Sequence, residues 1–178
     1  MRTPTVLTHR PDPAERAEIF REAVTMVLYV SVVEIAELTA LPEDHFAHGR
    51  VTGPVGARLL AIVWGTAVGL ALAHWFAFRL AAPAFRGEVP TVHDTWIGLA
   101  QVGGALFVAA VSSLPILFFS AVREQELAGD GPALIIGGVA YLLARRSGKP
   151  RVTAVFYGVT ALALGVLVAA VKSVLAAH

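Results

Sequence analysis

Residues 96–119 read WIGLAQVGGALFVAAVSSLPILFF, a run of 24 residues without Asp, Glu, Lys or Arg. A helix rises about 1.5 Å per residue, so the run is long enough to cross the roughly 30 Å hydrocarbon layer of a bilayer. Strands of membrane barrels alternate in polarity over only about ten residues, a pattern that this run lacks. It therefore predicts a transmembrane helix.

The chain on both sides of this run repeats its character. Four further apolar runs predict transmembrane helices over residues 23–41, 59–80, 132–144 and 152–171. The run 132–144 is short for a full crossing, and a re-entrant segment is the alternative. Leu127 to Asp130 can extend it on one side, and Arg145 and Arg146 can snorkel on the other. We therefore expect an all-α, polytopic integral membrane helix bundle, a single domain over residues 1–178 with about five spans.

Composition and charge exclude several classes of protein. Hydrophobic residues make up 56% of the chain and charged residues 15%, with a mean hydropathy of +0.68, whereas soluble domains contain about a quarter charged residues. A net charge of +1 offers no surplus for binding nucleic acid. The chain has no cysteine, which excludes disulfides, zinc–thiolate sites and thiol nucleophiles. The preference for Arg, Ala, Val and Gly is typical of GC-rich bacterial genomes.

Motifs of known enzyme chemistry are also missing. The sequence contains no phosphate-binding loop, His-Glu-x-x-His helix or Gly-x-Ser-x-Gly elbow. We therefore expect that the protein is not an enzyme and that it uses no cofactor. An intramembrane enzyme built on Glu34 and Ser112 or Ser113 stays open as an alternative.

The distribution of Lys and Arg predicts the orientation, because cytoplasmic loops of membrane proteins are enriched in these residues. With the N-terminus inside, ten of the 14 fall on the cytoplasmic side and four outside. This predicts a multipass plasma-membrane protein with a cytoplasmic N-terminus and an outer C-terminus. Residues 1–22 lack the pattern of a cleaved signal peptide. Glu15, Glu18 and Glu22 share one helical face, which predicts an interfacial amphipathic helix before the first span.

Ionisable residues inside spans are costly, so each one suggests a functional site. Glu34 and Glu37 lie near the outer end of the first span, at the depth of Ser112 and Ser113 in the third and Lys172 in the fifth. Two carboxylates this close in a low-dielectric setting should not both be ionised, so one would carry a proton. Alternatively, both hold a hard cation, or Glu37 pairs with Lys172 or Arg58 and Glu34 is a protonated packing group.

A second polar layer is expected near the inner ends of the spans. It comprises His74, Gln101 and Tyr157, together with Glu22, Thr25 and Tyr141. His74 would relay protons or be a neutral, hydrogen-bonded interior group. Between the two layers lie apolar positions, Val30, Gly69, Phe107 and Val108. They are compatible with a hydrophobic gate and equally with ordinary packing.

Small residues recur at four-residue steps in the predicted spans. Gly65 and Gly69 form a Gly-x-x-x-Gly pattern in the second span, and Gly165 lies in a similar stripe in the fifth. Such stripes let helices approach closely in lipid. They predict helix packing, either within the chain or between subunits.

The loop after the first span contains Asp44, His45 and His48. These residues would bind Zn²⁺ or Ni²⁺ if the loop were helical, and otherwise form a solvated surface.

Two functional hypotheses follow from these patterns. In the first, the protein is a channel or transporter for a small ion, a proton or cation, and acts in the lipid bilayer as a homo-oligomer. Glu34 and Glu37 form its outer ion site. In the second, it is a non-conducting accessory or assembly subunit of a larger membrane protein complex, and its buried charges only pair.

Overall fold

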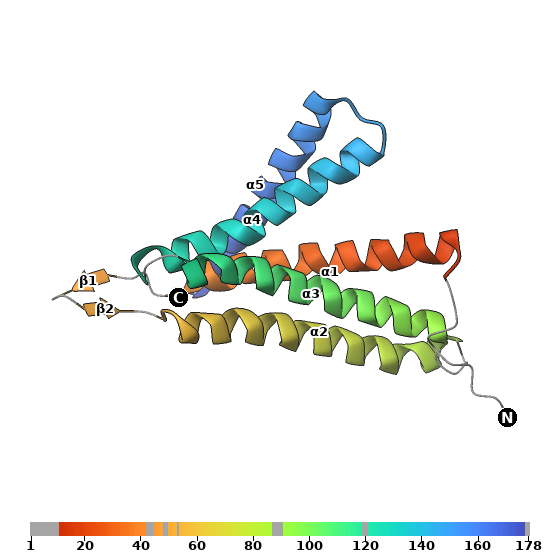
Figure 1. The fold of residues 1–178 in the computed structure, drawn as a ribbon, viewed down its shortest axis with the longest axis horizontal. Coiled ribbons are helices and arrows are strands. Elements are labelled where there is room, and N and C mark those ends of the chain that lie inside the picture. The colour runs from red at the N-terminus through yellow and green to blue at the C-terminus, as the bar shows by residue number, and fades with distance from the viewer. Residues whose placement is uncertain are drawn as a thin grey trace.

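The computed structural model describes residues 11–41, 45–47, 50–52, 54–86, 91–118 and 121–176 (Figure 1). Its elements, in chain order, are α1 (Pro13–Ala40), β1 (His45–Ala47), β2 (Arg50–Thr52), α2 (Ala57–Arg86), α3 (Val92–Phe118), α4 (Ala121–Arg146) and α5 (Arg151–Ala176). All five helices contain a segment long and apolar enough to cross a membrane. The prediction of five such helices is confirmed.

The two strands form a small antiparallel hairpin between α1 and α2, with His45 opposite Thr52. An exposed or helical loop was expected for this segment, so the hairpin is a correction. Three-residue strands are too short for a periodic signal in the sequence, and the pairing lies at one end of the long helices (Figure 1).

The fourth predicted span lies in the second half of a longer helix, α4. Its apolar core, 132–144, is extended at both ends, and the segment Leu127–Arg146 contains 20 residues. At about 1.5 Å per residue this length matches the hydrocarbon layer. Pro132 lies inside α4 and is fully buried. The apolar run is shorter than the helix because the helical turns on both sides of the run are polar or basic.

The segment expected to form an interfacial helix before the first span is the first part of α1, which is continuous from Pro13 to Ala40. A capping box starts it: Glu15 N donates to Asp12 Oδ1, and Asp12 N donates to Glu15 Oε2, both at 2.8 Å. These bonds satisfy amide groups that the first turn leaves unpaired. The acidic face faces α3, since His93 Nε2 lies 3.1 Å from Glu18 Oε2.

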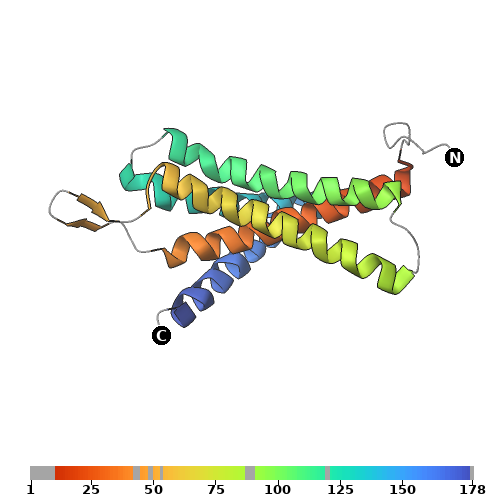
Figure 2. The ribbon, with the colours of Figure 1, turned by 90° about the horizontal axis from the view of Figure 1, so that it is seen from below.

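Helix α1 is the centre of the bundle and contacts all four other helices. It runs parallel to α3 with a nearly constant offset: Glu22 meets Gln101 and Glu34 meets Ser112, 79 and 78 residues apart in sequence. Helix α2 packs mainly on α3, and α4 pairs with α5. The α4–α5 hairpin lies across α1 and diverges from it toward the turn between α4 and α5 (Figure 1). Figure 2 shows the same helices from below.

Glycines mark the closest helix contacts. A Cβ on Gly104 of α3 would lie 2.8 Å from the backbone oxygen of Ala23 of α1, and one on Gly158 of α5 would lie 2.9 Å from that of Gly137 of α4. Gly165 packs on Ile136. The backbone contacts of Gly104 and Gly158 leave no room for a larger residue, so these two glycines allow the close approach of α1 to α3 and of α4 to α5.

The stripe predicted in α2 behaves differently. Gly65 and Gly69 are exposed, and no described atom lies within 4 Å of a Cβ built on either. Ala61 and Ala73, which continue the stripe, are exposed too. Within the described ranges, this face of α2 is therefore not used for packing inside the chain.

Candidate functional site

Among the described residues, the most deeply buried carboxylate belongs to Glu34 of α1, which is 1% exposed. Ser112 of α3, fully buried, donates its hydroxyl to Glu34 Oε2 at 2.5 Å. The other carboxylate oxygen, Oε1, has no hydrogen-bond partner among the described residues. Nor has the hydroxyl of Ser31, one turn earlier on the same helix and fully buried. The site thus holds one hydrogen-bonded pair of buried oxygens, Ser112 Oγ and Glu34 Oε2, and two buried oxygens without a described partner.

The parallel packing of α1 and α3 brings Glu34 and Ser112 together. Gly104 lets α3 approach the backbone of α1, and the shared rise of two parallel helices keeps later residues level. Pro115 of α3 cannot donate to the carbonyl four residues earlier, that of Val111. Helix α4 packs closely against α3 at that point, because a Cβ on Gly131 would lie 3.6 Å from Val111 O and from Ser112 Cα. Ser112 therefore lies where α3 faces both α1 and α4.

Two further polar contacts join the first three helices near the level of Glu34. Thr66 of α2 donates its hydroxyl to Glu37 Oε2 of α1. Trp64 of α2 donates Nε1 to Ser113 Oγ of α3 at 2.9 Å, and Ser113 donates to Ala109 O at 2.7 Å. Each pair among α1, α2 and α3 thus shares one side-chain hydrogen bond in this region.

No cation neutralises these carboxylates within the described part of the chain. Neither Glu34 nor Glu37 forms an ion pair there, and Arg58, one of the two expected partners of Glu37, is exposed near the start of α2. The side chain of Lys172, the other expected partner, lies outside the described residues. Glu37 is half-buried, and its described partner is the neutral hydroxyl of Thr66.

The expected inner polar layer is brought together only in part. Gln101 Nε2 donates to Glu22 Oε2 at 3.2 Å, while Gln101 Oε1 is buried without a described partner. His74, in contrast, is exposed on α2, and Tyr157 is 50% exposed on α5. Thr25 is exposed and donates to the backbone oxygen of Arg21. These residues lie at a similar depth along their helices, but each helix is rotated about its axis so that some of the side chains face the interior and others face outward.

The residues expected to form the apolar middle layer also differ in burial. Val30 and Val108 are fully buried between α1 and α3, whereas Phe107 is 53% exposed and Gly69 lies on the open face of α2. The apolar barrier between Glu34 and the Glu22–Gln101 pair therefore consists of packed core residues.

The contact of His93 with α1 was not predicted from the sequence. Its two ring nitrogens lie 3.1 Å from Glu18 Oε2 and 3.8 Å from Glu15 Oε1. His93 was assigned to neither of the expected polar layers. The spacing of the acids in residues 15–22 was the signal in the sequence for such a contact, because a half-buried acidic face next to a parallel helix needs polar partners.

The proposed metal ligands cannot be placed. Asp44 and His48 lie outside the described residues, and of His45 only the backbone, in β1, is described. Within the described ranges, no group of three or more His, Cys, Asp or Glu residues is arranged to hold a metal ion.

Comparison with protein-family models, with curated proteins and with solved structures finds no match. Function is therefore inferred from the chemistry of the side chains. The distinctive chemistry is that of Glu34: a buried carboxylate with one hydroxyl donor, a free oxygen, and a buried serine hydroxyl one turn away. Such a group can exchange a proton or contribute oxygen ligands to a cation.

Proposed function

We propose that the protein is a multipass plasma-membrane protein that conducts or exchanges a small ion, a proton or cation, as a homo-oligomer with its N-terminus in the cytoplasm. Five helices of sufficient length and hydropathy support membrane insertion. The single observation that carries the ion hypothesis is the burial of Glu34, 1% exposed, without a described cationic partner.

The physical argument starts from the cost of burying charge. An ionised carboxylate in the apolar interior is unfavourable by several kcal/mol unless it is paired. One hydroxyl bond from Ser112 compensates only part of that cost. The carboxylate of Glu34 therefore needs a proton or a cation, and the unpartnered oxygens of Glu34 and Ser31 are acceptors for either one.

Entry from the outer side would pass Glu37, which lies one turn nearer the outer end of α1 and is half-buried. On the inner side, the nearest polar groups of the α1–α3 interface are Glu22 and Gln101. Val30 and Val108 lie between and are fully buried, so an ion crosses only if this packing opens. Apolar constrictions of this kind gate channels by excluding water.

The homo-oligomer is supported by the open stripe of α2, which comprises Ala61, Gly65, Gly69 and Ala73. Small residues at four-residue steps pack helices closely in lipid, and this stripe has no partner within the described chain. The same observation favours the second candidate, an accessory subunit that docks on a larger membrane protein. The two candidates differ in whether Glu34 is reached by water.

Flux in proteoliposomes, under imposed pH and cation gradients, tests the proposal. We expect wild-type protein to conduct, Glu34→Gln to abolish flux, and Asp130→Asn to conduct as wild type. Asp130 is an exposed acid of α4 and undergoes the same loss of charge. Size-exclusion chromatography and circular dichroism establish that each variant is folded. Absence of flux for every ion with folded wild-type protein would refute conduction and favour the accessory subunit.

A further inference from the structure

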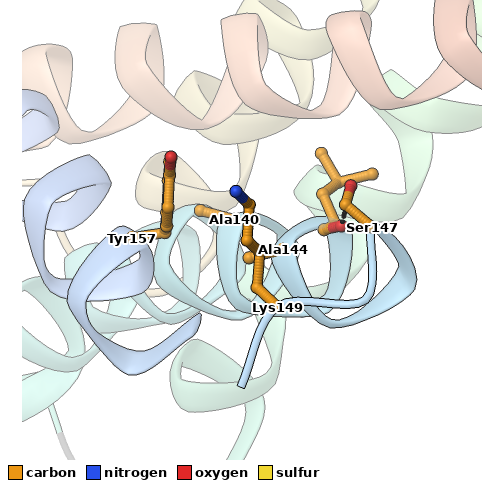
Figure 3. A pocket seen from close by; sticks show the side chains of 6 residues that line it. Ala140, Ala144, Ser147, Lys149 and Tyr157 are labelled. Atoms are coloured by element: carbon orange, nitrogen blue, oxygen red, sulfur yellow. Dashed lines mark hydrogen bonds between the residues drawn. The ribbon is translucent and has the colours of Figure 1, made fainter. Parts of the chain in front are cut away.

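A pocket of about 310 Å³ opens between α4 and α5 where the two helices join, and it is separate from the Glu34 site. Its lining consists of Ala140, Leu143, Ala144, Ser147, Lys149 and Tyr157. Figure 3 shows the side chains of Lys149 and Tyr157 extending to the same side, with the ammonium and the phenol oxygen at their tips. The pocket thus combines an apolar wall from α4 with the polar tips of Lys149 and Tyr157.

The turn between the helices holds Lys149 in place. Gly148 adopts a left-handed conformation with φ of +78°, which favours glycine. The amides of Gly148 and Lys149 donate to the carbonyls of Arg145 and Ala144 at 3.0 and 3.1 Å, which closes the end of α4. Arg145 Nη1 in turn donates to Lys149 O at 2.8 Å. A turn with this many bonds fixes where the lysine leaves the backbone.

The charge of this region is entirely positive. Residues 145–151 include Arg145, Arg146, Lys149 and Arg151 and no acid, and none of the four forms an ion pair within the described residues. Arg146 instead lies over the ring of Phe20 of α1, 4.9 Å from its centroid. The first turn of α5 also lacks an acid, so its free amide groups add to the positive potential. These exposed charges therefore attract anions.

The donors available to an anion can be identified. Ser147 already donates its hydroxyl to Leu143 O at 2.9 Å, the bond dashed in Figure 3. Lys149 and Tyr157 make no described hydrogen bond through their side chains. The ammonium of Lys149 and the phenol of Tyr157 are therefore the groups free to donate into the pocket.

The positions of these polar and apolar groups along α4 and α5 match one class of ligand. Lys149 lies in the turn, and Tyr157 lies six residues into α5, about 9 Å along the helix. Ala140, Leu143 and Ala144 form the apolar wall on the α4 side over this same stretch, and the neighbouring surface of α5 carries Val152 and Phe156, 83% and 69% exposed. A free anion would use only the polar groups, whereas a phospholipid uses both the polar groups and the apolar wall.

We propose that this pocket binds an anionic phospholipid, with the phosphate beside Lys149 and the glycerol region and the first part of an acyl chain packed between Tyr157 and the alanine-rich wall of α4. Basic pockets between transmembrane helices near the cytoplasmic surface recognise headgroups in this way. The inference rests on the membrane insertion proposed above and is independent of conduction. Retention in membranes after carbonate extraction tests insertion by itself.

The test is native mass spectrometry of the full-length protein in detergent, with added phosphatidylglycerol or phosphatidylcholine of the same acyl chains. We expect wild-type protein to retain phosphatidylglycerol in preference, and Lys149→Ala to bind it about fivefold more weakly, the effect of one cation near a membrane surface. Tyr157→Phe should show a smaller loss. The matched control is Arg58→Ala, which removes one exposed charge at the start of α2 and should bind as wild type.

Three outcomes overturn the proposal. The first is equal retention of the two lipids by wild-type protein. The second is unchanged phosphatidylglycerol binding in both Lys149→Ala and Lys149→Gln, two folded variants that remove the ammonium. The third is inorganic phosphate displacing the lipid at equal concentration, because that would show a site for free phosphate in which the apolar wall has no role.

Discussion

Ser112 and Ser113 are neighbours in α3 whose hydroxyls serve different helices. Ser112 donates to Glu34 of α1 at 2.5 Å, and Ser113 accepts from Trp64 of α2 at 2.9 Å. Successive residues of a helix point about 100° apart, so a serine pair can join α3 to two neighbours at the same depth. The carboxylate and the indole are thereby held at adjacent places in the bundle.

The first prediction concerns Ser112→Ala. It removes the only described donor to Glu34 and leaves both oxygens of the carboxylate unsatisfied, so we expect a loss of about 1–3 kcal/mol in the free energy of unfolding. Unfolding in mixed detergent micelles, followed by circular dichroism, measures the loss.

Glu34→Gln combined with Ser112→Ala provides the control for that measurement. If the serine acts through the carboxylate, its removal should cost less in the Glu34→Gln variant than in wild-type protein. Equal losses in both backgrounds would contradict a direct role for the hydrogen bond.

Part of this arrangement could be predicted from the sequence. Counting residues along each span placed Glu34 at the depth of Ser112, and the two side chains are bonded. The same counting grouped His74 with Gln101, yet His74 is exposed. Depth follows from the number of residues, whereas the direction of a side chain depends on how its helix is rotated, which packing decides. In α2 the packed face contains Leu59, Val63 and Ala67, so the glycine stripe faces outward.

Boundaries were harder to predict than the existence of the helices. The apolar span was expected to begin at Ala23 after an interfacial helix, and in the structure one helix, α1, runs through both from Pro13. Charged residues in its first turns signalled a segment outside the apolar layer, although the Asp12–Glu15 capping box and contacts with His93 support a continuous helix. Hydropathy reports the apolar part of a helix, and its ends depend on caps and partners.

The second prediction tests the close approach of α1 and α3. Gly104→Ala places a Cβ 2.8 Å from the backbone oxygen of Ala23, so the helices must separate, and we expect a loss of about 1–3 kcal/mol in stability. Gly103→Ala is the matched control, because no described atom lies within 4 Å of its Cβ. A gain of up to about 1 kcal/mol is expected there from helix propensity. Similar melting temperatures for the two variants would refute the described contact.

The third prediction concerns the stripe on α2. Gly65→Leu adds bulk where the described chain leaves open space, so the monomer should fold normally, while an oligomer that uses this face should dissociate. Chemical crosslinking in native membranes measures the change. Gly138→Leu, on an equally open position of α4, should leave the oligomer intact. Oligomers that persist in Gly65→Leu would place the interface elsewhere.

The fourth prediction decides between conduction and an accessory role. Because the chain has no cysteine, a single cysteine can report which positions water reaches. We expect Glu34→Cys to react with a small water-soluble methanethiosulfonate reagent, since an ion path must hydrate this position. Thr39→Cys, at an exposed position near the outer end of α1, should react faster, and Val30→Cys, fully buried one turn deeper, should not react. If position 34 is as unreactive as position 30 in folded protein, Glu34 is sealed within the bundle, and its carboxylate is then a packing group of an accessory subunit.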